Sequence, residues 1–170
     1  TALLQVPRIS QVLVLTQEPD RIAEALPKDE RLELNASGAT IASTLADLLS
    51  NPPRSFPLLV TTADHALLDP EMIEDFCAKA AGSDVAIGLV ERRPLLARLP
   101  TTQRTWLKFR GGAYSGANLF AFGSARAAKA IELWRSVEQD RKKGWRMIAT
   151  LGPAVLMGAV LRLRTLDQTL

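Results

Sequence analysis

Short apolar runs of about five to seven residues alternate along the chain with longer segments in which apolar side chains recur at helical spacing. The clearest run is 58–62 (LLVTT), which carries no charge. A run of this kind is typical of a strand buried on both faces of a parallel sheet. Strands are also predicted at 9–15, 85–90 and 117–122, with a brief extended piece at 32–34. A further strand is predicted at 106–110, with Lys108 and Arg110 on the same side.

Helices are predicted where apolar spacing of three or four residues follows a capping residue. Asp69 as N-cap, with Pro70 at the first helical position, marks one clear start, and Ser124 marks another. Ser37 is the expected N-cap of a third helix, whose apolar face comprises Ile41, Leu45, Leu48 and Leu49. Five helices are expected: 19–26, 41 to the Asn51-Pro52-Pro53 breaker, 70 to the Gly82 turn, 124–140 and 145–166. Residues 95–105 are expected to be irregular.

This alternation of strands and helices predicts an α/β fold. Crossovers of this length join parallel strands by right-handed connections, so we expect a three-layer, mostly parallel sheet with helices on both faces. The strands at 106–110 and 117–122 are separated by a short glycine turn and predict an antiparallel pair inserted beside that sheet. Residues 1–170 are expected to form one domain. Because Ala2-Leu3-Leu4 resembles the end of a helix, we expect that domain to be incomplete at its N-terminus and perhaps at its C-terminus.

Composition narrows the class of protein. The chain has 170 residues, of which 47% are hydrophobic and 23% charged, as in ordinary globular domains. A net charge of +3 suits phosphorylated substrates but does not indicate nucleic-acid binding. The single cysteine, Cys77, excludes an internal disulfide, and no secretory signal opens the chain. The longest apolar stretch, 147–161, is too short to span a bilayer and contains Gly152-Pro153, so a cytoplasmic location is expected.

The best candidate for chemistry is Asp64. It follows the 58–62 strand directly, and open α/β sheets bind their ligands outside the carboxyl ends of strands. The alternative is a turn aspartate that only accepts hydrogen bonds from nearby backbone groups. His65, the one histidine, is more consistent with a turn residue than with a catalytic base.

Three motifs carry a resemblance to a known family. They are LLVTTADHALLDPEMIEDF (58–76), NASGATIASTLADLL (35–49) and YSGANLFAF (114–122). In this order they resemble nucleotidyltransferases of the nucleotide-diphospho-sugar transferase fold, a Rossmann-like fold also called GT-A. The branch they resemble most is that of the molybdenum-cofactor-type NTP transferases. The resemblance covers about residues 32–122, and the family's N-terminal glycine-rich phosphate loop has no counterpart in the sequence.

The resemblance implies a role for each matching residue. Asp64 would be the catalytic residue that holds Mg²⁺ or Mn²⁺ at the nucleotide phosphates. Nucleotide binding would fall to Ser37, Gly38 and Thr40, and acceptor binding to Lys108, Tyr114, Gly116 and Asn118. Asn118 offers both a donor and an acceptor, whereas Lys108 is also explained as a solvated edge residue and Tyr114 as a cover for the hairpin.

The implied activity is Mg²⁺-dependent transfer of an NMP group from an NTP to a phosphorylated or hydroxyl acceptor, with release of pyrophosphate. The partners would be an NTP and a small-molecule acceptor, with no nucleic acid and no transmembrane segment; no oligomeric state is favoured. Residues 1–170 alone would lack the phosphate loop and are expected to be inactive. Two alternatives remain: a GT-A glycosyltransferase, for which the single acid of Thr62-Ala63-Asp64 is unfavourable, and a non-catalytic relative that binds a nucleotide or a protein.

Overall fold

The computed structural model describes residues 2–50, 56–109 and 111–139, so the predicted apolar helix at 145–166 lies outside the described residues. The chain divides into two compact units. Unit 1 comprises Thr1–Val90 and Gly116–Glu132, and unit 2 comprises Glu91–Ser115 and Leu133–Leu170. The fully buried apolar residues of the described chain, among them Val6, Ile73 and Ile131, belong to unit 1. The candidate residues Asp64 and Asn118 therefore belong to the unit that contains this core.

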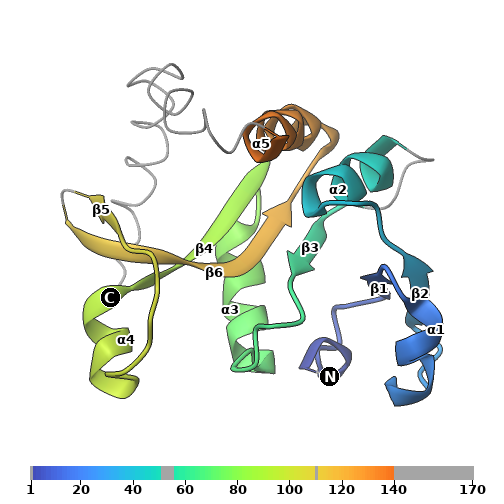
Figure 1. The fold of residues 1–170 in the computed structure, drawn as a ribbon, viewed down its shortest axis with the longest axis horizontal. Coiled ribbons are helices and arrows are strands. Elements are labelled where there is room, and N and C mark those ends of the chain that lie inside the picture. The colour runs from blue at the N-terminus through green and yellow to red at the C-terminus, as the bar shows by residue number, and fades with distance from the viewer. Residues whose placement is uncertain (1, 51–55, 110, 140–170) are drawn as a thin grey trace. The chain divides into compact units, whose positions relative to one another are not determined.

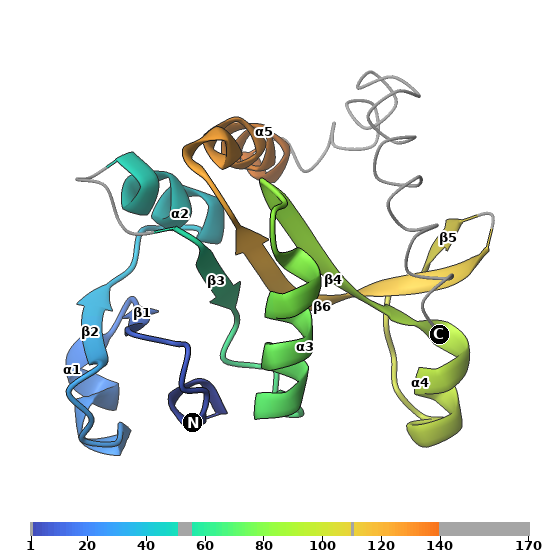
Figure 2. The same cartoon turned by 180° about the vertical axis from the view of Figure 1, so that it is seen from behind.

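A parallel strand pair forms the first part of unit 1. After the 3₁₀ helix η1 (Ala2–Gln5), β1 (Val12–Thr16) pairs in parallel with β2 (Leu32–Ala36), as Figure 2 shows. The crossover between them contains α1 (Pro19–Ile22) and the 3₁₀ helix η2 (Ala23–Ala25). This confirms the predicted strand–helix–strand order, and the extended piece expected at 32–34 is a full strand.

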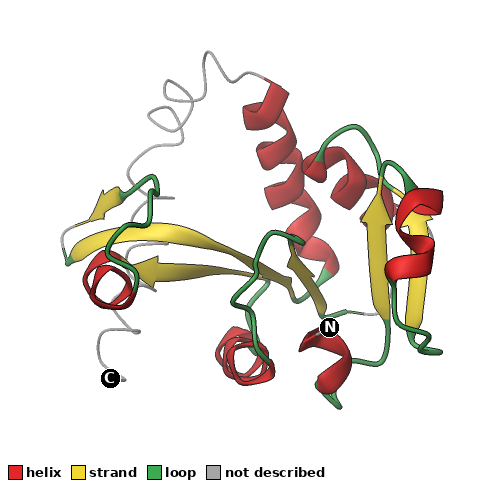
Figure 3. Ribbon diagram, turned by 60° about the horizontal axis from the view of Figure 1, so that its bottom comes forward, coloured by secondary structure: helices red, strands yellow, loops and turns green. Residues whose placement is uncertain are grey.

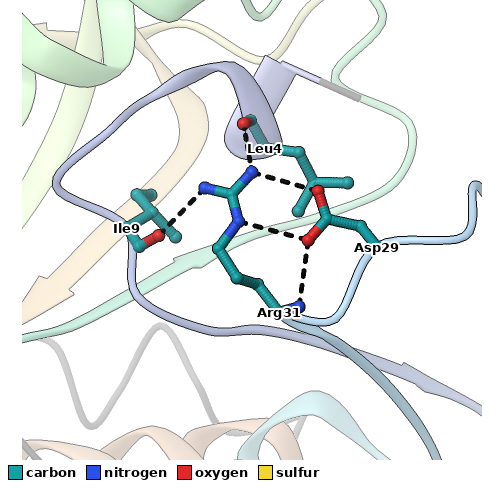
Figure 4. Close-up of polar contacts among 4 residues, drawn as sticks. All are labelled: Leu4, Ile9, Asp29 and Arg31. Atoms are coloured by element: carbon teal, nitrogen blue, oxygen red, sulfur yellow. Dashed lines mark hydrogen bonds and ion pairs between the residues drawn. The ribbon is translucent and has the colours of Figure 1, made fainter.

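Arg31, just before β2, fastens the N-terminal segment to this pair (Figure 4). Its guanidinium donates to the Leu4 carbonyl at 2.6 Å and to the Ile9 carbonyl at 3.3 Å. The same group holds Asp29 through both carboxylate oxygens, with Nε–Oδ1 at 3.2 Å and Nη2–Oδ2 at 3.1 Å. Such planar, bidentate pairing suits arginine and leaves the Asp29 charge compensated.

The second sheet is organised around one long strand. β6 (Gly112–Phe122) lies between β3 (Leu58–Thr61) and β4 (Val85–Glu91), and β5 (Leu107–Phe109) also pairs with it (Figures 1 and 3). The β3–β6 and β5–β6 pairings are antiparallel. An antiparallel pair was predicted here, but its second strand begins at 112 and not at 117, and the residues paired with β5 are 112–114. Its placement beside a parallel sheet was wrong, because β6 runs between β3 and β4. The four residues of β3 are half-buried, so burial on both faces was also wrong.

At two glycines, one in β4 and one directly after β6, the backbone lies so close to neighbouring atoms that there is little room for a side chain. Gly88 of β4 lies against Leu119 and Ala117, where an added Cβ would come within 3.1 Å of the Leu119 Cβ. At Gly123, just after β6, an added Cβ would come within 2.1 Å of the Ser83 carbonyl oxygen. Because that neighbour is backbone and cannot move easily, only glycine fits at 123.

Three helix caps were predicted from the sequence, and the structure confirms two of them. Asp69 caps α3 (Pro70–Ala80) by accepting from the Met72 N–H at 2.7 Å. Ser124 caps the 3₁₀ helix η3 (Ala125–Ala127), which leads into α5 (Ala128–Gln139). The third helix, α2 (Ile41–Ser50), begins at residue 41 as predicted, but its capping residue differs from the prediction.

Thr40, rather than Ser37, caps α2. The Thr40 Oγ1 accepts from the Ser43 N–H at 3.1 Å, and the Ser43 Oγ accepts from the Thr40 N–H at 3.0 Å. This reciprocal arrangement is a capping box in which serine replaces the usual Glu or Gln. Along the helix, Leu45 is buried as predicted, whereas Ile41 is exposed. The cap is therefore Thr40, directly before the helix, and the predicted Ser37 cap was wrong.

Unit 2 contains a helix that the sequence pattern did not predict. α4 (Arg92–Arg98) occupies part of the segment expected to be irregular. Pro94 is the third residue of this helix, where an N–H has no intrahelical acceptor, so proline is tolerated.

The described part of the chain contains no helix that is both long and apolar enough to cross a membrane.

Candidate functional site

The loop after β3 places Asp64 at the surface. The His65 N–H donates to the Thr62 carbonyl at 3.2 Å, and the Leu68 N–H donates to the His65 carbonyl at 3.1 Å. These successive turns lead directly to the Asp69 cap of α3. Because the turns are closed by backbone groups, the Asp64 carboxylate is not needed to cap them, and Asp64 is exposed.

Two neutral donors hold the Asp64 carboxylate. The Thr62 hydroxyl donates to Oδ1, and the Asn118 side-chain N–H donates to the same oxygen at 3.3 Å. Within the described residues, these bonds reach only Oδ1, so Oδ2 retains its accepting capacity. The structure thus brings together Asp64 and Asn118, which the sequence analysis assigned to the metal site and the acceptor site respectively.

Strand register explains why residues 54 positions apart meet. Thr61 of β3 is paired with Leu119 of β6 in the antiparallel ladder. Thr62, the residue after β3, and Asn118, the residue before Leu119 on β6, therefore lie at the same end of this pairing. Asn118 has a φ of +51°, a left-handed conformation that asparagine tolerates better than most residues. This local bend accompanies its reach toward Asp64.

Hydrogen bonding makes Asp64 more acidic. The Thr62 hydroxyl is the main cause of the lowered pKa of Asp64; desolvation opposes it, while the Asn118 amide, the Asp64 N–H and the nearby His65 lower the pKa further. Donors to a carboxylate favour its charged form. Because its pKa is lowered, Asp64 is ionised at neutral pH. Its main donors are uncharged, so they do not offset its negative charge.

The site can bind a cation only together with other ligands. No group of three or more His, Cys, Asp or Glu side chains in the described residues could enclose a metal ion. Magnesium, however, is often held by one or two carboxylates, with waters and substrate phosphates completing its shell. An exposed, ionised carboxylate with one open oxygen fits that mode of binding and does not fit a closed structural site.

Residues 37–40 form a tight loop between β2 and α2. The Ser37 N–H donates to the Thr16 carbonyl at 2.7 Å, which extends the β1–β2 ladder. The Gly38 N–H donates to the Thr44 hydroxyl at 2.9 Å. An added Cβ on Gly38 would come within 2.8 Å of the Ser43 Oγ, so the start of α2 packs against this glycine. The two backbone N–H groups expected near a nucleobase are therefore already engaged.

The remaining predicted residues lie in different surroundings. At Gly116, which is exposed, an added Cβ would meet no atom within 4 Å. Lys108 and Tyr114 belong to unit 2, where Lys108 is exposed and the Tyr114 ring meets the Phe109 ring edge-on at 5.8 Å. This ring contact agrees with the alternative explanation for Tyr114, in which its side chain packs over the hairpin. The acceptor roles of these three residues stay predictions.

Thr62 is a hydrogen-bond partner of Asp64 that the sequence analysis did not identify. A signal was present, because hydroxyl side chains beside a turn often form local hydrogen bonds, and Thr62 lies two residues before Asp64. His65 also has an unusual environment: within the described residues, its buried Nδ1 has no hydrogen-bond partner, and the same holds for the Thr61 hydroxyl oxygen.

The sequence matches no protein-family model and no curated protein. Solved structures do match over most of the chain. A hypothetical transferase from Thermus thermophilus is 23% identical, with a TM-score of 0.65, and the match covers 87% of this chain and 61% of that one. The 4-diphosphocytidyl-2C-methyl-D-erythritol synthase from Anaerococcus prevotii DSM 20548 is 12% identical, with a TM-score of 0.60, and the match covers 87% and 69%. This chain thus spans about three fifths of the Thermus protein, and the likeness is one of fold.

Proposed function

We propose that this chain is part of a nucleotidyltransferase that transfers an NMP group from an NTP to a phosphorylated or hydroxyl acceptor and releases pyrophosphate. The observation that carries the proposal is the exposed Asp64 carboxylate, which two neutral donors hold and keep ionised. The fold supports it, because one solved structure of similar fold is named as a diphosphocytidyl-methylerythritol synthase. The GT-A assignment and the molybdenum-cofactor-type branch are parts of this proposal.

Asp64 is the residue that would hold Mg²⁺ or Mn²⁺. When bound, the cation would neutralise charge on the nucleotide phosphates and on the departing pyrophosphate. Asp64 supplies the negative ligand, and the Thr62 and Asn118 hydrogen bonds both end on Oδ1 and leave Oδ2 for the cation. Thr62 and Asn118 fix the orientation of the carboxylate, as partners of a metal ligand generally do.

Asn118 has a second role in this proposal. Its side-chain N–H is bound to Asp64, which leaves the amide oxygen available as an acceptor. That oxygen could accept a hydrogen bond from a hydroxyl of the acceptor, next to the carboxylate that organises the phosphates. Gly116, two residues earlier on β6, has open space where a side chain would project, which suits the approach of a ligand.

Nucleotide binding is assigned to Ser37, Gly38 and Thr40. Because the Ser37 and Gly38 N–H groups already donate within the protein, base contacts would use the Ser37 hydroxyl and the loop carbonyls. Carbonyl oxygens accept from exocyclic amino groups, so this loop would favour a base that carries one. Backbone NMR during titration with each of the four NTPs tests this assignment, and unchanged signals at 37–40 with every NTP would remove the loop from the nucleotide site.

The main experiment replaces Asp64 by Ala in the full-length protein. Asp64→Ala should lower Mg²⁺-dependent pyrophosphate release by at least about 100-fold, because the charge that positions the cation is lost. Asp47→Ala is the matched control, since Asp47 is an exposed aspartate on α2 and its removal changes net charge equally. Turnover by Asp64→Ala near the wild-type rate would exclude Asp64 from the mechanism. Slow hydrolysis of an NDP-sugar in place of pyrophosphate release would favour a glycosyltransferase.

A further inference from the structure

The charges of the chain are distributed very unevenly. Unit 1 contains eight Lys or Arg and fourteen Asp or Glu, a net charge of −6. Unit 2 contains thirteen Lys or Arg and four Asp or Glu, a net charge of +9. The net charge of +3 for the whole chain therefore conceals one acidic and one strongly basic unit. Such asymmetry is characteristic of proteins that meet an anionic surface or polymer.

Within unit 2, a continuous basic segment comprises residues 91–109, which include α4 and β5. Five of its residues are basic and exposed: Arg92, Arg93, Arg98, Arg104 and Lys108. Its one acidic residue, Glu91, is half-buried. The segment therefore presents positive charge to solvent with little compensating negative charge of its own.

Apolar side chains are exposed within the same basic segment. Leu99, which follows α4, is 40% exposed, and Leu107, in β5, is 45% exposed. The Arg92 guanidinium lies 5.9 Å from the centre of the Trp106 ring, a cation–π contact that joins the start of α4 to the residue before β5. Arginines interspersed with exposed leucines and a tryptophan are the combination found in segments that rest on a lipid–water interface.

We propose that the basic segment docks on the surface of an anionic phospholipid membrane. The arginines and Lys108 would contact headgroup phosphates, and Leu99 and Leu107 would enter the boundary between headgroups and acyl chains. A single-stranded nucleic acid is less favoured, because it needs aromatic faces on which bases stack. In this unit, the Trp106 ring is in contact with Arg92, and the Tyr114 ring meets Phe109. This proposal goes beyond nucleotidyl transfer and requires no nucleotide.

Co-sedimentation of the chain with vesicles tests the proposal. The protein should bind vesicles of phosphatidylglycerol and phosphatidylcholine, bind pure phosphatidylcholine far more weakly, and lose affinity as salt rises. Arg93→Gln combined with Arg98→Gln should weaken binding about 25-fold, because each basic residue near an anionic surface contributes about 5-fold. The matched control is Lys28→Gln combined with Lys129→Gln, which removes the same charge from exposed positions of unit 1.

Leu99→Ser combined with Leu107→Ser keeps every charge and should weaken vesicle binding at least about 5-fold. The loss should be largest for the binding that remains at high salt, because that binding comes from the apolar side chains. Circular dichroism verifies that each variant is folded. Equal binding to neutral vesicles, no binding to anionic vesicles in dilute salt, or equal losses in the arginine variant and its control would overturn the proposal. Displacement from vesicles by millimolar inorganic phosphate, or by RNA at lower concentration than lipid, would reassign the surface to a soluble anion or to nucleic acid.

Discussion

Two aspartates of unit 1 show how similar hydrogen bonding can serve different purposes. Asp29 and Asp64 both accept side-chain hydrogen bonds, and in both the pKa is lowered by those bonds first of all. The donors differ. Asp29 is held by Arg31 through both oxygens, whereas Asp64 is held through one oxygen by the uncharged Thr62 and Asn118.

The two carboxylates differ in whether their negative charge is neutralised by a neighbouring residue. At Asp29, the guanidinium neutralises the carboxylate and raises the pKa of Arg31 in return. Arg31 also donates to the carbonyls of Leu4 and Ile9, so the pair fastens one segment of chain to another. At Asp64, the carboxylate is oriented but not neutralised, which is the condition for binding a cation. The first pair is structural, and the second is suited to a ligand.

The largest predicted effect on stability follows from breaking the structural pair. Arg31→Ala removes the guanidinium donors to Asp29, Leu4 and Ile9 together and should lower Tm by roughly 5 °C, although the backbone N–H of residue 31 still donates to Asp29. Thermal unfolding followed by circular dichroism measures this. Asp64→Ala should change Tm by a much smaller amount, because its carboxylate closes none of the backbone turns around it. A larger loss of Tm from Asp64→Ala than from Arg31→Ala would reverse the distinction between the two sites.

A second prediction concerns the orientation of Asp64. Asn118→Gly removes the amide and keeps the left-handed backbone, which glycine adopts freely, so strain does not obscure the result. Affinity for Mn²⁺ in the presence of an NTP should fall about 10- to 100-fold, as is usual when the partner of a metal ligand is lost. Isothermal titration calorimetry measures the affinity. Asn35→Gly provides the comparison, since Asn35 contacts Glu33 and lies in β2; an equal loss there would mean that the effect is not specific to Asp64.

The sequence predicted those parts of the fold that depend on local pattern. Asp69 and Ser124 cap helices as expected, because a cap is determined by residues within one turn of it. The Ser37 cap failed because Thr40 and Ser43 together satisfy two N–H groups, a better local solution. α4 was missed because residues 95–105 were expected to be irregular, although the first turn of a helix tolerates a proline such as Pro94.

Strand neighbours were harder to predict, because pairing depends on distant residues. Nothing within 58–62 indicates that β3 would pair with β6, some sixty residues later, and in the antiparallel sense. The same limitation applies to the site. Asp64 and Asn118 were each selected from their own strand, and only the register of β3 on β6 places one beside the other. Thr62 was overlooked because it was considered part of the strand and not a donor to the carboxylate two residues later.

The smallest predicted effect is a shift in the titration of Asp64. Its folded pKa is lowered, so the stability that its hydrogen bonds contribute is present above the unfolded pKa and is lost as pH falls through the folded value. Thr62→Val removes the main cause of the lowering and should raise the pKa of Asp64 toward its ordinary value, while the pKa of Asp29 stays unchanged because its donor is Arg31. Carboxyl ¹³C chemical shifts followed from pH 7 downward report both groups in one experiment. Unchanged titration of Asp64 in Thr62→Val would show that the hydroxyl does not stabilise the carboxylate, and the proposed orientation of Asp64 would then depend on Asn118 alone.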